Sequence, residues 1–163
     1  MILIALGANL PSPVGGPQQT LEAALKRLQA NGVRIVAHSR WYRTAPVPVS
    51  DQPWFVNGVA RVETTLEPTA LLVLLRLVER EFGRQRTVRN AARTLDLDII
   101  DYDGRVENTP ELTLPHPRMQ DRAFVLLPLA EIAPGWRHPI LGKAVENLIS
   151  ELPPEQKAEP MHV

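Results

Sequence analysis

The sequence contains no cysteine, and this absence excludes several kinds of site at once. Without thiols there can be no disulfide, no thiolate zinc site and no cysteine nucleophile. Net charge is also missing, because 18 lysines and arginines balance 18 aspartates and glutamates. A chain without net charge has no global field that would attract nucleic acid or an anionic membrane. Any anion-binding site must therefore be a local cluster of charges.

Long hydrophobic runs are missing as well. The opening run from Ile2 to Leu6 lacks a basic flank and is too short for a signal-peptide core or a membrane span. The patterns GxxxxGK[ST], GxGxxG, GxSxG and HExxH do not occur, which argues against P-loop and Rossmann nucleotide sites, a nucleophile elbow and a zincin site. We therefore expect a cytoplasmic protein that binds neither membrane nor nucleic acid.

What is present is the composition of an ordinary globular protein, with 163 residues, 44% hydrophobic and 22% charged. This length suits one compact domain, so we expect residues 1–163 to form a single unit. The proline-rich end of the chain, from Pro153 to Val163, is expected to be a mobile tail. We expect the protein to act as a monomer, although no feature of the sequence sets its oligomeric state.

The hydrophobic pattern predicts an α+β fold. Short apolar or alternating runs predict strands over residues 2–6, 33–42, 55–65 and 94–102. Helical periodicity after Pro17 and Pro68, ended by Gly32 and Gly83, predicts two helices between them. The order β-α-β-β-α-β is that of a ferredoxin-like sandwich. We expect a further hairpin around Gly104 and helices over 123–132, with Pro128 early in it or kinking it, and over 141–152.

Two acidic residues on the last predicted strand of this core form the sharpest candidate site. Side chains alternate between the faces of a strand, so Asp96 and Asp98 share a face with Cα atoms roughly 6.5 Å apart, while Leu97 enters the core. Magnesium commonly binds one or two carboxylates and completes its shell with substrate phosphates. The alternative is a pair of strand-edge acids neutralised by neighbouring arginines, and spacing alone does not choose between the two.

An arginine-rich segment leads directly into this acidic pair and contains Arg84, Arg86, Arg89 and Arg93. Guanidinium groups bind phosphate oxygens in pairs and stay charged at any working pH. A basic loop beside paired carboxylates is typical of a metal-bound polyphosphate site. The same segment could also be a solvated surface loop with incidental ion pairs.

Two further segments supply candidate ligand contacts. His116 stands between two prolines, where its ring could donate to a phosphate, and Arg122 follows at a helix start. Phe55 and Asn57 share one strand face, so that the ring could stack on a flat heterocycle and the amide could read its edge. Taken alone, such features are more often an incidental loop histidine and ordinary core packing by the phenylalanine.

These features, in this order, resemble the 6-hydroxymethyl-7,8-dihydropterin pyrophosphokinase family. The similarity runs from Ile2 to Pro134, and its most specific part is the stretch from Arg89 to Ile100. The segments Phe55-Val56-Asn57, Gly83-Arg84 and Leu114-Pro115-His116 also match in order. The resemblance implies transfer of pyrophosphate from ATP to the hydroxymethyl group of the pterin, giving AMP, in folate biosynthesis.

The resemblance also implies a role for each site residue. Asp96 and Asp98 would hold two Mg²⁺ ions, and together with Arg84 and Arg93 they form the expected catalytic set. The residues expected to contact ATP are Glu79, Arg84, Arg89, Arg93, Ile99, Thr113, His116 and Arg122. Those expected around the pterin are Gly7, Thr44, Ala45, Pro46, Phe55, Asn57, Asp96 and Phe124, with the two phenylalanines sandwiching its ring. Arg76 stands where glutamine is frequent in the family and is not assigned to the site.

The expected chemistry is in-line attack of the hydroxymethyl oxygen on the β-phosphorus of ATP, with AMP leaving. Segments 44–53 and 84–92 flank the site and are expected to order when ATP binds, excluding water. The alternatives are an RNA-binding module on the same fold, a regulatory domain that binds nucleotide without turnover, and a related enzyme with another acceptor. The predicted strand over 94–102 carries no stacking aromatic before Tyr102, which disfavours the RNA-binding module.

Overall fold

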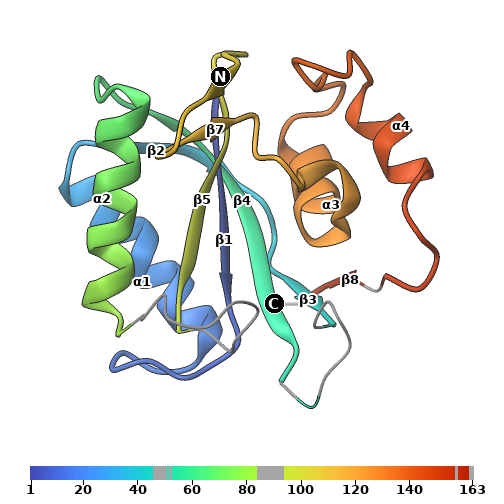
Figure 1. Cartoon of the computed structure of the whole chain (residues 1–163). Helices are drawn as coiled ribbons and strands as arrows, with labels where there is room; N and C mark the ends of the chain where they lie inside the picture. The colour runs from blue at the N-terminus through green and yellow to red at the C-terminus, as the bar shows by residue number, and fades with distance from the viewer. Residues whose placement is uncertain (46–50, 52, 84–93, 157, 162–163) are drawn as a thin grey trace.

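A computed structural model of the chain describes residues 1–45, 51, 53–83, 94–156 and 158–161. An antiparallel sheet runs through its centre in the order β5-β1-β4-β3-β8, and β2 also pairs with β4 (Figure 1). The strands of this sheet are β1 (Ile2–Ala8), β2 (Arg34–His38), β3 (Tyr42–Thr44), β4 (Phe55–Glu63), β5 (Asp96–Tyr102) and β8 (Ala158–Pro160). The α+β prediction is confirmed, since β5, β1, β4 and the β2/β3 pair keep the ferredoxin-like order.

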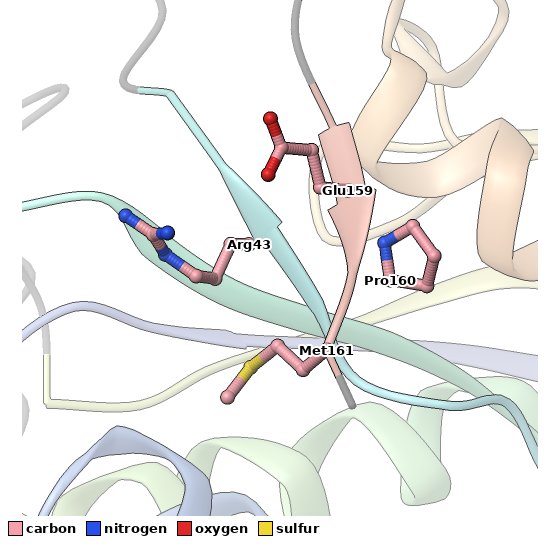
Figure 2. A pocket seen from close by; sticks show the side chains of 4 residues that line it. All are labelled: Arg43, Glu159, Pro160 and Met161. Carbon is pink, nitrogen blue, oxygen red and sulfur yellow. The ribbon is translucent and has the colours of Figure 1, made fainter. Parts of the chain in front are cut away.

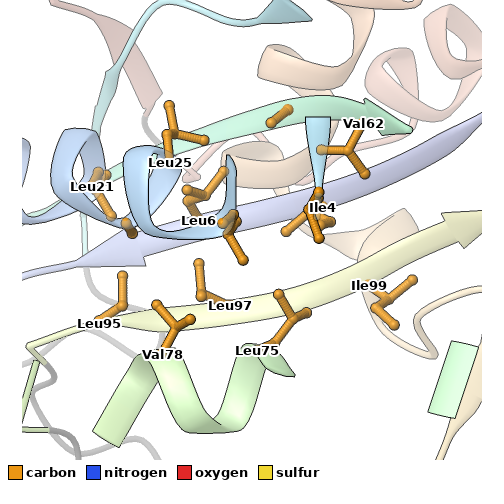
Figure 3. Close-up of a cluster of buried hydrophobic side chains, with 14 of the residues drawn as sticks. Ile4, Leu6, Leu21, Leu25, Val62, Leu75, Val78, Leu95, Leu97 and Ile99 are labelled. Atoms are coloured by element: carbon orange, nitrogen blue, oxygen red, sulfur yellow. The ribbon is translucent and has the colours of Figure 1, made fainter. Parts of the chain in front are cut away.

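Two helices, α1 (Pro17–Ala30) and α2 (Pro68–Glu81), cover one face of the sheet (Figure 1). Each begins with a proline, whose missing N–H is not needed in the first turn. Their apolar stripes pack on the side chains that the strands send to this face, and the cluster is shown in Figure 3. Its members include Ile4, Leu6, Leu21, Leu25, Val62, Leu75, Val78, Leu95, Leu97 and Ile99. The cluster under α1 and α2 is the larger of the two hydrophobic cores of the protein.

The opposite face of the sheet is covered by α3 (Ala123–Ile132) and α4 (Val145–Ser150), after a short 3-10 turn at Met119–Asp121 (Figure 1). The second core joins Leu3, Val59 and Ile100 of the sheet to apolar side chains of α3, α4 and Trp136. Pro128 lies in the middle of α3 and not early in it. With 10 and 6 residues, α3 and α4 are shorter than α1 and α2, which have 14 each, so the two faces are covered unequally.

A third acid of β5 has a structural role that separates it from the candidate pair. Asp101 is 4% exposed, and it accepts hydrogen bonds from the Trp136 indole at 2.8 Å and from the Gly104 backbone at 3.0 Å. The register of β1 against β5 shifts between Leu3 and Ile4, so Asp101 lies on the α3 side. One carboxylate oxygen of Asp101 thus attaches the segment after α3 to the sheet, and the other holds the turn after β5.

The structure corrects four expectations. The strand expected over 33–42 is divided into β2 and β3, because Ser39 turns its hydroxyl to the Arg40 carbonyl and the Val59 N–H between them. Gly104 lies in a tight turn, while the paired hairpin is β6 (Glu107–Asn108) with β7 (Thr113–Leu114). The last helix begins at Val145, after a turn in which Gly142 has φ 69°.

The fourth correction concerns the end of the chain. The segment from Pro153, expected to be a mobile tail, contributes strand β8, which pairs with β3 from Tyr42 to Thr44. Before it, the Gln156 carboxamide accepts from the Ala123 N–H at 2.8 Å and donates to the Asp121 carbonyl. This segment therefore extends the sheet and fixes the start of α3.

No helix within the described residues is both long enough and apolar enough to cross a membrane.

Candidate active site

The paired acids of β5 lie side by side on the α3 face of the sheet. Leu95, Leu97 and Ile99 enter the core under α1 and α2, so the alternating residues Asp96 and Asp98 point the other way. Both acids are partly exposed, with 27% of the Asp98 side chain accessible. The predicted sharing of one strand face is therefore present in the structure.

The neighbouring strand presents small side chains beside this pair. In the β1–β5 ladder, Ala5 is opposite Asp98 and Gly7 is opposite Asp96. On its other side, Gly7 is opposite Asn57 of β4. The row Asn57–Gly7–Asp96 thus crosses three strands on one face, with no side chain at its centre. Because Ala5 and Gly7 have little or no side chain, the surface of the sheet between the acids and Asn57 is open; we call this surface the floor of the site.

Asn57 is held in one orientation by its neighbours. It is 6% exposed, and its amide nitrogen donates to the hydroxyl of Thr44, which is 2% exposed. A Cβ atom on Gly7 would lie 2.5 Å from the amide oxygen of Asn57, too close for any real contact. Glycine is therefore required at position 7 for this placement of the carboxamide.

Aromatic side chains border the same face. Phe55 lies two residues before Asn57 on β4 and shares its face by alternation. Phe124, in the first turn of α3, packs at the margin of the second core and remains partly exposed. The Arg122 guanidinium lies 5.3 Å above the centre of the Phe124 ring, a cation–π distance. One face of the Phe124 ring is thus in contact with the positive charge of Arg122.

His116 approaches the acids from the segment after β7. Its backbone N–H donates to the Ile100 carbonyl of β5 at 3.1 Å, and its Nε2 lies 4.0 Å from an oxygen of Asp98. Burial lowers the pKa of His116 below its ordinary 6.5, although Asp98 acts in the opposite direction. The Arg118 N–H donates to Nδ1 at 3.3 Å, so in the neutral ring the proton is on Nε2. His116 therefore presents an N–H donor beside Asp98.

Arg76 also contacts this site, and sequence reasoning missed it. From α2 its guanidinium reaches Asp98 at 3.4 Å, the Leu97 carbonyl at 2.7 Å and Glu79 at 3.1 Å. Glu79, 2% exposed, accepts in turn from the Leu97 N–H at 2.8 Å. The two polar groups of the Leu97 backbone, between the paired acids, are thus bound by two side chains of α2. The one signal in the sequence that could have indicated this role is that arginine stands at position 76, where glutamine is frequent in the family.

The acids suit a hard divalent cation that completes its shell with substrate oxygens. Among the described residues there is no group of three or more histidines and acids placed to hold a metal by themselves. A pair of carboxylates on one strand face fits magnesium, which typically takes one or two protein carboxylates and keeps water or phosphate as its other ligands.

Comparisons with known proteins identify the family of the chain. The family model described as 7,8-dihydro-6-hydroxymethylpterin-pyrophosphokinase matches residues 3–134, most of the chain. The chain belongs to this family. Its 2-amino-4-hydroxy-6-hydroxymethyldihydropteridine pyrophosphokinase relative from Pseudomonas aeruginosa is 44% identical over 152 residues, covering 93% of this chain and 91% of that protein. The protein of the same name from Haemophilus influenzae is 45% identical over 131 residues, covering 80% and 79%.

Other members of the pyrophosphokinase family are longer. The chain is 34% identical to the folic acid synthesis protein fol1 of Pneumocystis carinii over 151 residues, 93% of this chain but 20% of that protein. A crystal structure of Plasmodium falciparum HPPK-DHPS has a TM-score of 0.74 at 15% identity, covering 92% of this chain and 42% of that one. The structural likeness supports the fold, and this chain spans less than half the length of these two proteins.

The structure gathers most of the described residues that the pyrophosphokinase resemblance singled out, but on two sides of β5. The members on the α3 face or at its margin are Gly7, Phe55, Asn57, Asp96, Asp98, His116, Arg122 and Phe124, with Thr44 bonded to Asn57. Ala45 follows Thr44 directly, and Thr113 lies in β7, beside β5. The side chains of Glu79 and Ile99 are buried on the α2 side. Pro46, Arg84, Arg89 and Arg93, and the proposed loop closures, lie outside the described residues.

A separate hollow lies between β3 and β8 and is lined by Arg43, Glu159, Pro160 and Met161 (Figure 2). Arg43 is opposite Val56 of the α1/α2 core, so it lies on the other face of the sheet from Asn57. The hollow is therefore distinct from the candidate active site.

We predict that His116 titrates below 6.5 in the metal-free protein and that its neutral form carries the proton on Nε2, because burial disfavours the charged ring. Long-range proton–nitrogen NMR of the imidazole measures both properties. Since the folded pKa is lowered, the contribution of this group to stability is complete above about 6.5 and is lost as the pH falls toward the folded pKa.

The Asp98→Asn variant supplies the control for this titration. Asp98 favours the charged ring, so its removal should lower the pKa of His116 further. A wild-type midpoint above 6.5, or a rise in the variant, contradicts the assignment.

Proposed function

We propose that the chain transfers the pyrophosphoryl group of ATP to the hydroxymethyl group of 6-hydroxymethyl-7,8-dihydropterin, giving AMP and the pterin diphosphate in folate biosynthesis. The observation that carries this proposal is the row Asn57–Gly7–Asp96. It places a fixed carboxamide, suited to the edge of a heterocycle, across a bare glycine from the carboxylate pair. We also propose that the enzyme acts as a cytoplasmic monomer.

The pterin would bind on the open floor over Gly7. Phe55 and Phe124 border this floor from β4 and α3, so a flat ring between them could stack while Asn57 bonds its edge. Thr44 holds the Asn57 carboxamide before the substrate arrives, which limits the rotational entropy lost on binding. The hydroxymethyl group of a pterin so oriented can be directed toward Asp96 and Asp98.

The polyphosphate of ATP would lie over the acids and His116. Asp96 and Asp98 would hold two Mg²⁺ ions, which, when bound, neutralise phosphate charge and stabilise the entering and leaving oxygens. The Nε2–H of His116, beside Asp98, and the guanidinium of Arg122, over the Phe124 ring, are the donors that would reach it. Both can contact phosphate oxygens that gain charge in the transition state.

The reaction forms a bond between the hydroxymethyl oxygen and the β-phosphorus and breaks the bond from that phosphorus to the oxygen bridging to the α-phosphorus. AMP leaves with this oxygen, and the hydroxyl proton is released. Phosphoryl-type transfer passes through a loose transition state, so positioning and charge stabilisation contribute more than base catalysis. The side chains of the site accordingly act as ligands and donors.

The direct test is AMP release from ATP and magnesium, with and without the pterin. We expect pterin-dependent AMP from the wild type and a loss of kcat of roughly 10²- to 10³-fold in Asp96→Asn and in Asp98→Asn, because each removes one charged ligand. The matched control is Asp103→Asn, an exposed acid with φ 54°, a conformation that asparagine tolerates.

Each alternative function has its own result in this assay. Magnesium-dependent ATP binding without AMP would favour a regulatory domain, and AMP release that needs another acceptor would change the substrate. Tight RNA binding with a steep salt dependence would favour an RNA-binding module. Full activity in both acid variants would contradict the proposed site.

A second prediction concerns Gly7. In Gly7→Ala the new methyl group displaces the Asn57 carboxamide from the Thr44 hydroxyl, so we expect the pterin Kd to rise by about tenfold, the value of one lost hydrogen bond to a buried group. Fluorescence titration with the pterin measures this, and the Kd of a non-hydrolysable ATP analogue should stay within about twofold.

The control for Gly7→Ala is Gly16→Ala, the same change at the start of α1, where the added atom meets only the flexible end of Gln19. A folded Gly7→Ala protein with unchanged pterin affinity would show that the row across β4, β1 and β5 does not bind the pterin.

A further inference from the structure

Arg76 brings a permanent positive charge to the proposed metal site from the opposite side of the sheet. β5 is at one end of the strand order, so a side chain of α2 can pass its edge and reach Asp98 on the α3 face. The Arg76 side chain is 27% exposed, and its two terminal nitrogens are divided between Asp98 and the Leu97 carbonyl. Arg76 thus joins the helix that packs on one face to the carboxylate on the other.

The guanidinium is fixed in this position by more than its contact with Asp98. Glu79 lies three residues later on α2, is 2% exposed and pairs with Arg76 at 3.1 Å. A buried carboxylate left without this cation would be strongly disfavoured, so Arg76 cannot turn far into solvent. Arginine also cannot lose its proton to escape the site.

We propose that Arg76 acts as an internal counter-ion of Asp98 that weakens cation binding by the nucleotide-free protein. A divalent cation at Asp96 and Asp98 is repelled by the guanidinium beside Asp98, so the acids alone hold it poorly. The negative charge of ATP offsets the charge of the divalent cation and that of the Arg76 guanidinium. The metal and the nucleotide therefore bind together. Arg76 is in this sense a positioning residue of the reaction, and the inference rests on the proposed metal site.

The test measures Mn²⁺ binding to the free protein by electron paramagnetic resonance of the unbound ion. Arg76→Gln removes the charge but keeps an amide donor for the Leu97 carbonyl, and we expect its Mn²⁺ affinity to rise by roughly tenfold. Adding a non-hydrolysable ATP analogue should strengthen Mn²⁺ binding more in the wild type than in this variant. Arg76→Met removes the charge and the hydrogen-bond donor together. Urea unfolding of both variants measures any loss of stability, so that this loss can be separated from the change in Mn²⁺ affinity.

Two controls make the result specific. Arg80→Gln removes an equal charge from an exposed position on α2 and should leave the affinity for Mn²⁺ within about twofold of the wild type. In an Asp98→Asn background the Arg76→Gln change should have little effect, because the proposed repulsion acts at the Asp98 site.

The outcomes distinguish the inference from the function on which it rests. Wild-type Mn²⁺ binding that Arg76→Gln leaves unchanged, or that Arg80→Gln raises equally, overturns the counter-ion role alone. A wild type that binds no Mn²⁺ even with the ATP analogue overturns the proposed metal site and the counter-ion role together.

Discussion

The antiparallel pairing of β1 with β5 is the constraint on which the site depends. Its register sets Gly7 opposite Asp96 and Ala5 opposite Asp98, with Leu97 buried between the acids. A slip of one residue would send both carboxylates into the apolar core and Leu97 into water, so the hydrophobic effect enforces the register. Hydrogen bonds from Arg76 and to Glu79 hold the Leu97 backbone at the same point. Folding energy thus fixes the spacing of the acids.

The unequal cover of the two faces explains why the site lies where it does. On one face α1 and α2 bury the apolar residues of the strands, including Leu95 and Ile99. On the other face α3 begins at Ala123, and the strands beside its start carry Gly7, Asn57 and Asp96 in place of large apolar side chains. A sheet that needed both faces filled for stability would have no room for two substrates. Here the larger core stabilises the fold, and the second face carries the proposed site.

The parts of this account that sequence predicted are those that depend on local periodicity. Alternation placed Asp96 and Asp98 on one face, and the prolines and glycines marked the ends of α1 and α2. The interruption at Ser39, the pairing of β8 and the reach of Arg76 to Asp98 depend on contacts between distant segments. Periodicity carries no information on such contacts. The roles of Arg84, Arg89 and Arg93 stay predictions, because they lie outside the described residues.

The most direct test of the central claim follows the phosphorus atoms of ATP. With ATP labelled separately at the α-, β- and γ-phosphorus, the account predicts that the β and γ labels move together to the pterin and that the α label stays in AMP. If the hydroxymethyl oxygen attacks the β-phosphorus, the three labels can be distributed between AMP and the pterin in no other way. Transfer of the γ label alone, leaving ADP, or release of label as inorganic phosphate without the pterin would contradict it.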